Sequence, residues 1–179
     1  MSKIRELQSR HRENVSRVGR GPVELREEYV LPLRSLELAH IAREYLGAAS
    51  FLASQPSTDW PGHHSLPWFQ LIGQSLELSL KAFIAASRLP PPQHHDLIRL
   101  FEQAEQRGYV PPDEEHMLVH VVILDHWFHR HAATGTKYGS RYGNHGGGTV
   151  PDHNKLARFV ESVIEQADSL ARHALESTR

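Results

Sequence analysis

The residues best suited to chemistry lie in a glycine-rich segment, residues 132–151, with the sequence AATGTKYGSRYGNHGGGTVP. Arg141 and His145 stand near each other in it, beside Lys137, Tyr138 and Tyr142. Cleavage of RNA by its own 2′-hydroxyl needs a general base and a cation that stabilises the charge on phosphorus. His145 and Arg141 supply these two roles without a metal. The six glycines open backbone N–H groups to phosphate, and the tyrosines can stack on bases. The plainer interpretation is a basic surface loop.

A second polar pair, Glu77 and Lys81, stands four residues apart in an otherwise apolar stretch. The ordinary interpretation is an ion pair along one helix, which contributes a few tenths of a kcal/mol when it is exposed. The alternative, suggested by the apolar stretch around the pair, is that Glu77 and Lys81 face a polar groove or a dimer seam.

Fourteen histidines raise the question of a metal site. His116 and His120 have the i, i+4 spacing that lets two imidazoles reach one metal ion, and His126, His129 and His131 follow. No His-Glu-x-x-His motif is present, and the absence of cysteine excludes disulfides and thiolate ligands. We therefore predict neither a metal nor another cofactor. His95 is expected to be a turn residue before a helix cap at Asp96, and the three tryptophans are expected to be packing residues: Trp60, Trp68 and Trp127.

Five segments have the spacing of apolar residues that is typical of helices: 33–53, 68–88, 97–107, about 111–128, and 156–174. Residues 68–88 are apolar on nearly every face, which predicts a helix at the centre of the domain. Val121, Val122 and Ile123 are β-branched, so a strand is conceivable there, but no second strand exists to pair with it. The pattern predicts an all-α bundle.

Length and composition favour one globular domain in 179 residues with a net charge of -1. Residues 1–22 are rich in arginine and predict a basic N-terminal arm, either a solvated tail or an arm that contacts phosphate; residues 23–179 form the domain. No apolar run reaches the roughly 18–20 residues of a membrane span, and the N-terminus lacks the apolar stretch of a secretory signal. A cytoplasmic location without membrane attachment is the expectation.

Three short motifs then occur in a characteristic order. Residues 77–82 read Glu-Leu-Ser-Leu-Lys-Ala, residues 95–97 read His-Asp-Leu, and Arg141-Tyr142 precedes the last expected helix. Together they resemble the HEPN (higher eukaryotes and prokaryotes nucleotide-binding) superfamily over about residues 33–175. The resemblance implies an up-and-down bundle of about five helices, often a homodimer. Many such proteins are RNA-cleaving toxins or partners of nucleotidyltransferases.

The resemblance also bears on catalysis. HEPN ribonucleases typically carry an arginine and a histidine separated by four to six residues, whereas only three separate Arg141 from His145. We therefore expect a protein that binds RNA or a nucleotide through the glycine-rich segment, within a toxin–antitoxin or defence system and with an antitoxin or nucleotidyltransferase as partner. One alternative is a metal-independent ribonuclease that uses Arg141 and His145. The other is a non-catalytic module that dimerises or docks a partner through its central and last helices.

Overall fold

The structure, a computed structural model, describes residues 27–55, 65–112, 114–133 and 153–177. These ranges contain no strand and form the following five helices: α2 (Glu27–Ser54), α3 (Ser65–Ala86), α4 (Leu97–Glu105), α5 (Glu114–Ala133) and α6 (His153–Glu176). The predicted all-α fold is confirmed. None of these helices is both long and apolar enough to cross a membrane.

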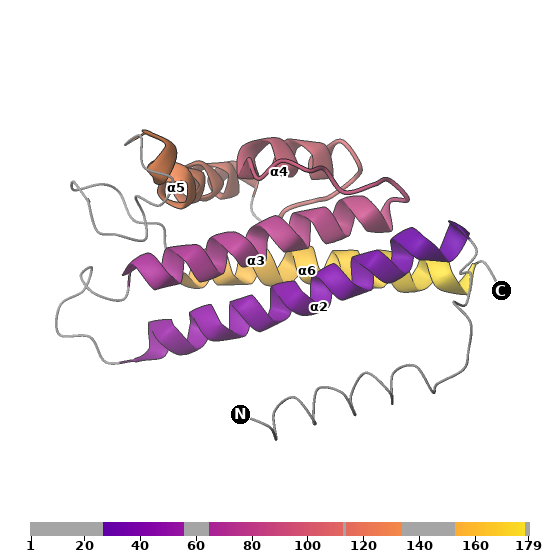
Figure 1. Cartoon of the computed structure of the whole chain (residues 1–179), viewed down its shortest axis with the longest axis horizontal. Helices are drawn as coiled ribbons and strands as arrows, with labels where there is room; N and C mark the ends of the chain where they lie inside the picture. The colour runs from indigo at the N-terminus through magenta and orange to yellow at the C-terminus, as the bar shows by residue number, and fades with distance from the viewer. Residues whose placement is uncertain (1–26, 56–64, 113, 134–152, 178–179) are drawn as a thin grey trace, which may run out of the picture.

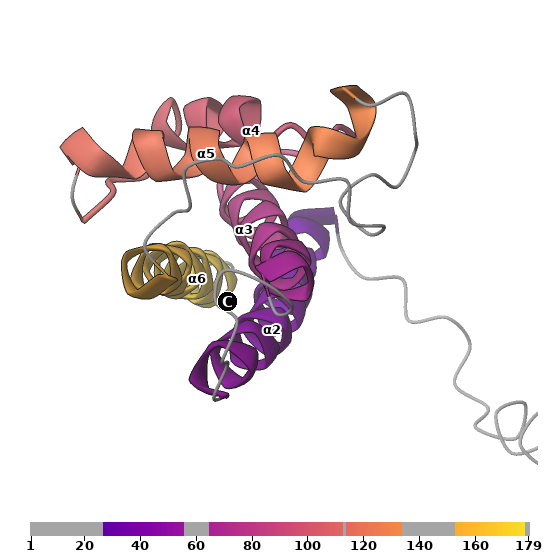
Figure 2. The ribbon, with the colours of Figure 1, turned by 90° about the vertical axis from the view of Figure 1, so that its left-hand side faces the viewer.

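Helix α3 lies at the centre of the fold. Figure 2 shows it between the α4–α5 pair on one side and the α2–α6 pair on the other. Its apolar residues therefore have partners in several directions, and Ile72, Leu76 and Leu80 are completely buried. This is the position expected for a helix that is apolar on nearly every face. Two buried serines add hydrogen bonds between helices: Ser35 Oγ donates to Ala82 O at 2.8 Å, and Ser75 Oγ donates to Ala42 O at 2.7 Å.

Three long helices form the base of the bundle. Helix α2 runs antiparallel to α3 and α6, so the end of α2 and the beginnings of α3 and α6 meet at one end of the molecule (Figure 1). Helix α5 runs across the long axis above α3 (Figure 2). The apolar spacing in α5 is helical as predicted, since Met117, Val121 and Leu124 are all buried.

Local sequence signals predict the ends of α4 correctly but not the beginning of α2. Asp96 caps α4 as predicted, with its carboxylate accepting a hydrogen bond from Arg99 N at 2.9 Å. Gly108 follows α4 with φ +90°, a backbone conformation that suits glycine. The predicted beginning of the first helix at Leu33 is wrong, because α2 begins at Glu27 and includes Pro32. A proline so near the N-terminus removes only one hydrogen bond between turns, so the helix tolerates it.

Candidate functional site

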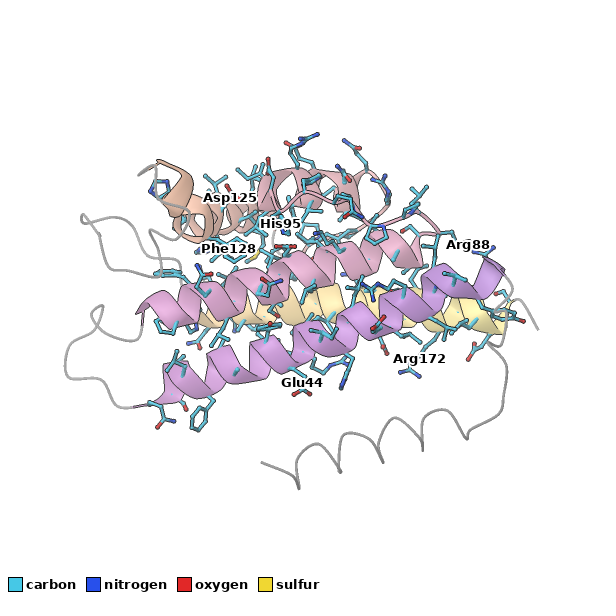
Figure 3. All side chains as sticks on the ribbon, in the orientation of Figure 1. Glu44, Arg88, His95, Asp125, Phe128 and Arg172 are labelled. Carbon is cyan, nitrogen blue, oxygen red and sulfur yellow. The ribbon has the colours of Figure 1, made fainter. Side chains whose placement is uncertain are left out.

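One face of α3 meets the α4–α5 pair through Gly73, Glu77 and Lys81, which recur every four residues. We call these three residues the α3 seam. A Cβ atom added to Gly73 would lie 2.4 Å from Cδ2 of Phe128, so α5 lies directly against the helix backbone here. Figure 3 shows His95, Asp125 and Phe128 gathered where α4 and α5 cover α3. The α3 seam is thus a contact between helices of the same chain.

Glu77 is the centre of a polar network within this seam. Its Oε1 accepts a hydrogen bond from Lys81 Nζ at 2.8 Å and also lies 2.8 Å from Nδ1 of His95. The Glu77 side chain is only 3% exposed and that of Lys81 11%, whereas that of His95 is 68% exposed. Within the described residues, the buried Oε2 of Glu77 has no hydrogen-bond partner. The ion pair predicted along the helix is present, but it is buried and shared with a third residue.

The beginning of α4 is held by two carboxylates next to this network. Asp125 of α5 accepts a hydrogen bond from Leu97 N at 3.0 Å, and Asp96 accepts one from Arg99 N. Two of the amide groups that a helix N-terminus leaves open are therefore already engaged. His95, Asp96 and Asp125 connect α3, α4 and α5 over a short distance, so the network fixes the position of α4.

This cluster offers limited chemistry. With the proton on Nδ1, the His95 imidazole donates to Glu77 and directs Nε2 to solvent. Among the contacts that the structure describes here, the carboxylate of Glu77 is engaged by Lys81 and His95, and those of Asp96 and Asp125 accept from backbone N–H groups of α4. These contacts serve the packing of α4 on α3 and do not form a site for phosphate. Among the residues that the structure describes, no group of three or more His, Cys, Asp or Glu side chains is arranged to hold a metal ion.

A pocket of about 200 Å³ lies at the other candidate site, the end of the bundle where α2 ends and α3 and α6 begin. The rings of Trp68 and His153 stack beside it, with centroids 3.9 Å apart and planes at 23°. Trp68 is 2% exposed, so the expectation that it packs in the core is confirmed. The pocket is lined by the following residues from the three helices: Ala49, Ser50, Ala53, Ser54, Trp68, Ile72, His153, Asn154 and Ala157. We call it the α6 pocket.

The sequence offered one signal for this pocket that our prediction did not use. His153 and Asn154 follow the glycine-rich segment almost directly, separated from it by Asp152 alone. These first two residues of α6 line the pocket, and in the sequence they come directly after this segment and Asp152. The stacking of His153 on Trp68, 85 positions away, follows from the helix packing and is not visible in the sequence.

Comparison with known proteins assigns a family to most of the helical bundle. The sequence profile of the HEPN domain matches residues 35–170, well over half of the 179 residues. The chain belongs to the HEPN domain family. No curated protein and no solved structure matches it. The HEPN match covers most of α2, all of α3, α4 and α5, and α6 as far as Leu170, so both the α3 seam and the α6 pocket lie within the HEPN domain.

The glycine-rich segment also lies within the HEPN match. Its five candidate residues fall outside the described residues and stay predictions: Lys137, Tyr138, Arg141, Tyr142 and His145. The same holds for the basic arm, residues 1–22. Glu77 and Lys81 are described, and they belong to the packing between α3 and α4 on a different face of α3 from the α6 pocket.

Proposed function

We propose that this HEPN-family chain binds RNA or a nucleotide at the end of the bundle where α6 begins. The observation that carries the proposal is the α6 pocket with its stacked Trp68 and His153, at the beginning of the helix that follows the glycine-rich segment in the sequence. Because the net charge is only -1, binding depends on a local site rather than on the charge of the whole chain.

An exposed cation on α6 supports this proposal. Arg158 is exposed and stands one turn after Asn154 on α6, so the two side chains share one face of the helix. Lys137 and Arg141 of the glycine-rich segment are the further phosphate contacts that we propose. Tyrosine and arginine side chains stack on bases without regard to sequence, which suits a site for single-stranded RNA.

We expect Arg141→Ala and Arg158→Ala each to weaken the binding of a labelled single-stranded RNA. Loss of one phosphate contact lowers affinity by roughly threefold at moderate salt and flattens the slope of log K against log salt by about 0.7. The measurement is fluorescence anisotropy at two salt concentrations.

Arg172→Ala is the matched control, because it removes the same charge from the same helix roughly 20 Å further along. Arg172 Nε donates to Asp168 Oδ2 at 2.8 Å, and this hydrogen bond raises the pKa of the guanidinium. Equal affinities for wild type, Arg141→Ala and Arg158→Ala would contradict these phosphate contacts, and a wild type that binds no RNA would contradict the proposed function. The same RNA incubated in EDTA tests for cleavage: a product made by wild type but not by His145→Ala would make the chain a metal-independent ribonuclease instead.

We also propose that the chain forms a homodimer through α5. Three large apolar side chains are exposed there at helical spacing, Leu118 at 46%, Val119 at 55% and Val122 at 44%. Exposed apolar patches of this kind mark sites of association. The alternative is that these are isolated exposed side chains with no role in association, like Val30 on α2, which is 46% exposed.

We expect light scattering to give twice the chain mass of 20.4 kDa for wild type and the monomer mass for Val119→Glu/Val122→Glu. Val30→Glu, which adds a charge at an exposed valine on another helix, is expected to remain dimeric. A wild-type monomer at high concentration would exclude the homodimer. Membership in a toxin–antitoxin or defence system is part of the same proposal, and a neighbouring gene for an antitoxin or a nucleotidyltransferase would support it.

A further inference from the structure

We infer that the α6 pocket holds one unpaired base of a single-stranded RNA, while the ribose and phosphates stay outside. This inference rests on the proposed function and assigns its ligand class. The base-paired bases of a duplex are stacked on their neighbours and cannot enter such a pocket, so the site selects single strands.

The size of the pocket decides how much of a nucleotide enters. An engineered cavity of about 150 Å³ holds benzene, and pockets for drug-sized ligands span roughly 300–1,000 Å³. A volume of about 200 Å³ lies between these limits. It accommodates the ring system of one base but not the attached ribose and phosphate, which therefore lie at the rim.

The walls of the pocket suit a flat aromatic ligand. The aromatic part of the lining is the Trp68–His153 stack. Trp68 is 2% exposed and His153 is half-buried, so His153 is the more accessible of the two rings, and its stacking on Trp68 holds it in place. Small side chains make up much of the remaining lining, among them Ala49 and Ala53 of α2 and Ala157 of α6. Alanine at these three positions leaves open the space that a larger apolar side chain would fill.

Polar groups at the pocket can read the edge of a base. The amide of Asn154 carries both a donor and an acceptor, the combination that pairs with two adjacent groups of a base. The hydroxyl of Ser50 adds a further donor and acceptor. Ser54 contributes less, because its hydroxyl already donates to Phe51 O at 2.7 Å. Arg158 is exposed one turn after Asn154 on α6, and we assign it to the phosphate of the same nucleotide.

The test fills the pocket. Ala53 is exposed at the end of α2 and lines the pocket, so Ala53→Phe occupies the space for a base without replacing a buried residue. Ala48→Phe adds the same ring at an exposed position of α2 that does not line the pocket. The probes are a labelled pentanucleotide RNA, the same RNA with an abasic central position, and a duplex of the same sequence.

For wild type and Ala48→Phe, we expect the abasic RNA to bind roughly tenfold more weakly than the intact RNA, as for the loss of one stacked base. The duplex should bind more weakly than the single strand. In Ala53→Phe the difference between intact and abasic RNA should disappear. Asn154→Ala, which keeps the pocket open and removes the amide, should reduce the difference without abolishing it. Far-ultraviolet circular dichroism checks that each variant is folded.

The outcomes separate the two proposals. Binding that depends on Arg141 and Arg158 but is equal for intact and abasic RNA overturns the base pocket and leaves the proposed function standing. A base-dependent difference that Ala53→Phe removes, with no effect of the arginine substitutions, supports the pocket and contradicts the phosphate contacts. A difference that persists in both Ala53→Phe and Asn154→Ala overturns the pocket, and a wild type that binds no RNA overturns both proposals.

Discussion

Replacing Glu77 by glutamine is expected to lower the free energy of unfolding by about 3 kcal/mol. The substitution keeps the size of the side chain but removes the charge that faces Lys81 and His95. Removing one partner of a buried ion pair typically costs about 3–5 kcal/mol, because the other charge is left without compensation. We expect the lower end of this range, since 11% of the Lys81 side-chain surface remains exposed and the ammonium group can move toward water. Urea denaturation monitored by circular dichroism measures the change.

The matched control is Glu37→Gln. Glu37 pairs with Arg34 on α2, three residues away, and both side chains are about half exposed. Exposed pairs contribute at most about 1 kcal/mol, so Glu37→Gln should leave the free energy of unfolding nearly unchanged. Glu77→Met combined with Lys81→Met removes both buried charges and should recover most of the loss. Equal effects of Glu77→Gln and Glu37→Gln would show that the seam carries no buried charge interaction.

The network around Glu77 also shows where sequence reasoning ends. The spacing of Glu77 and Lys81 predicted their ion pair, and the sequence before Asp96 predicted a turn residue at His95. That His95 lies against Glu77, 18 positions earlier, depends on how α4 packs on α3. The contact between Asp125 and Leu97 N depends in the same way on α5. Contacts within one helix follow from its periodicity, whereas contacts between helices require their crossing geometry.

The fold could be predicted from the sequence more completely than the site could, for a related reason. The apolar period identified the helices, and the apolar surround of α3 predicted its central position, since a helix can be apolar on all faces only when neighbours cover it. The error at the beginning of α2 came from treating Pro32 as a helix start, although the helix continues back to Glu27. The residues predicted for RNA binding, such as Arg141, remain a prediction from residue type and spacing, to be tested by the titration proposed above.

A second large effect is expected for Gly73→Ala. Replacing glycine by alanine is expected to stabilise the protein in α2 but to destabilise it at Gly73 of α3. In an unobstructed helix, replacing glycine by alanine stabilises a protein by about 0.5–1 kcal/mol. At Gly47 of α2, no atom lies within 4 Å of the added Cβ, so Gly47→Ala should raise the free energy of unfolding by this amount. At Gly73 the added Cβ would lie 2.4, 2.8 and 2.9 Å from three carbons of the Phe128 ring.

We expect Gly73→Ala to lower the free energy of unfolding by roughly 2–3 kcal/mol, because the ring of Phe128 is buried and α5 must move away to accept a methyl group. Phe128→Ala removes the obstructing ring, so in that background Gly73→Ala should cost far less than in wild type. A double-mutant cycle measured by urea denaturation isolates this coupling. If Gly73→Ala stabilised the protein as Gly47→Ala does, the ring of Phe128 would not lie against the backbone of α3. The close packing of α4 and α5 on α3, which buries Glu77, would then be contradicted as well.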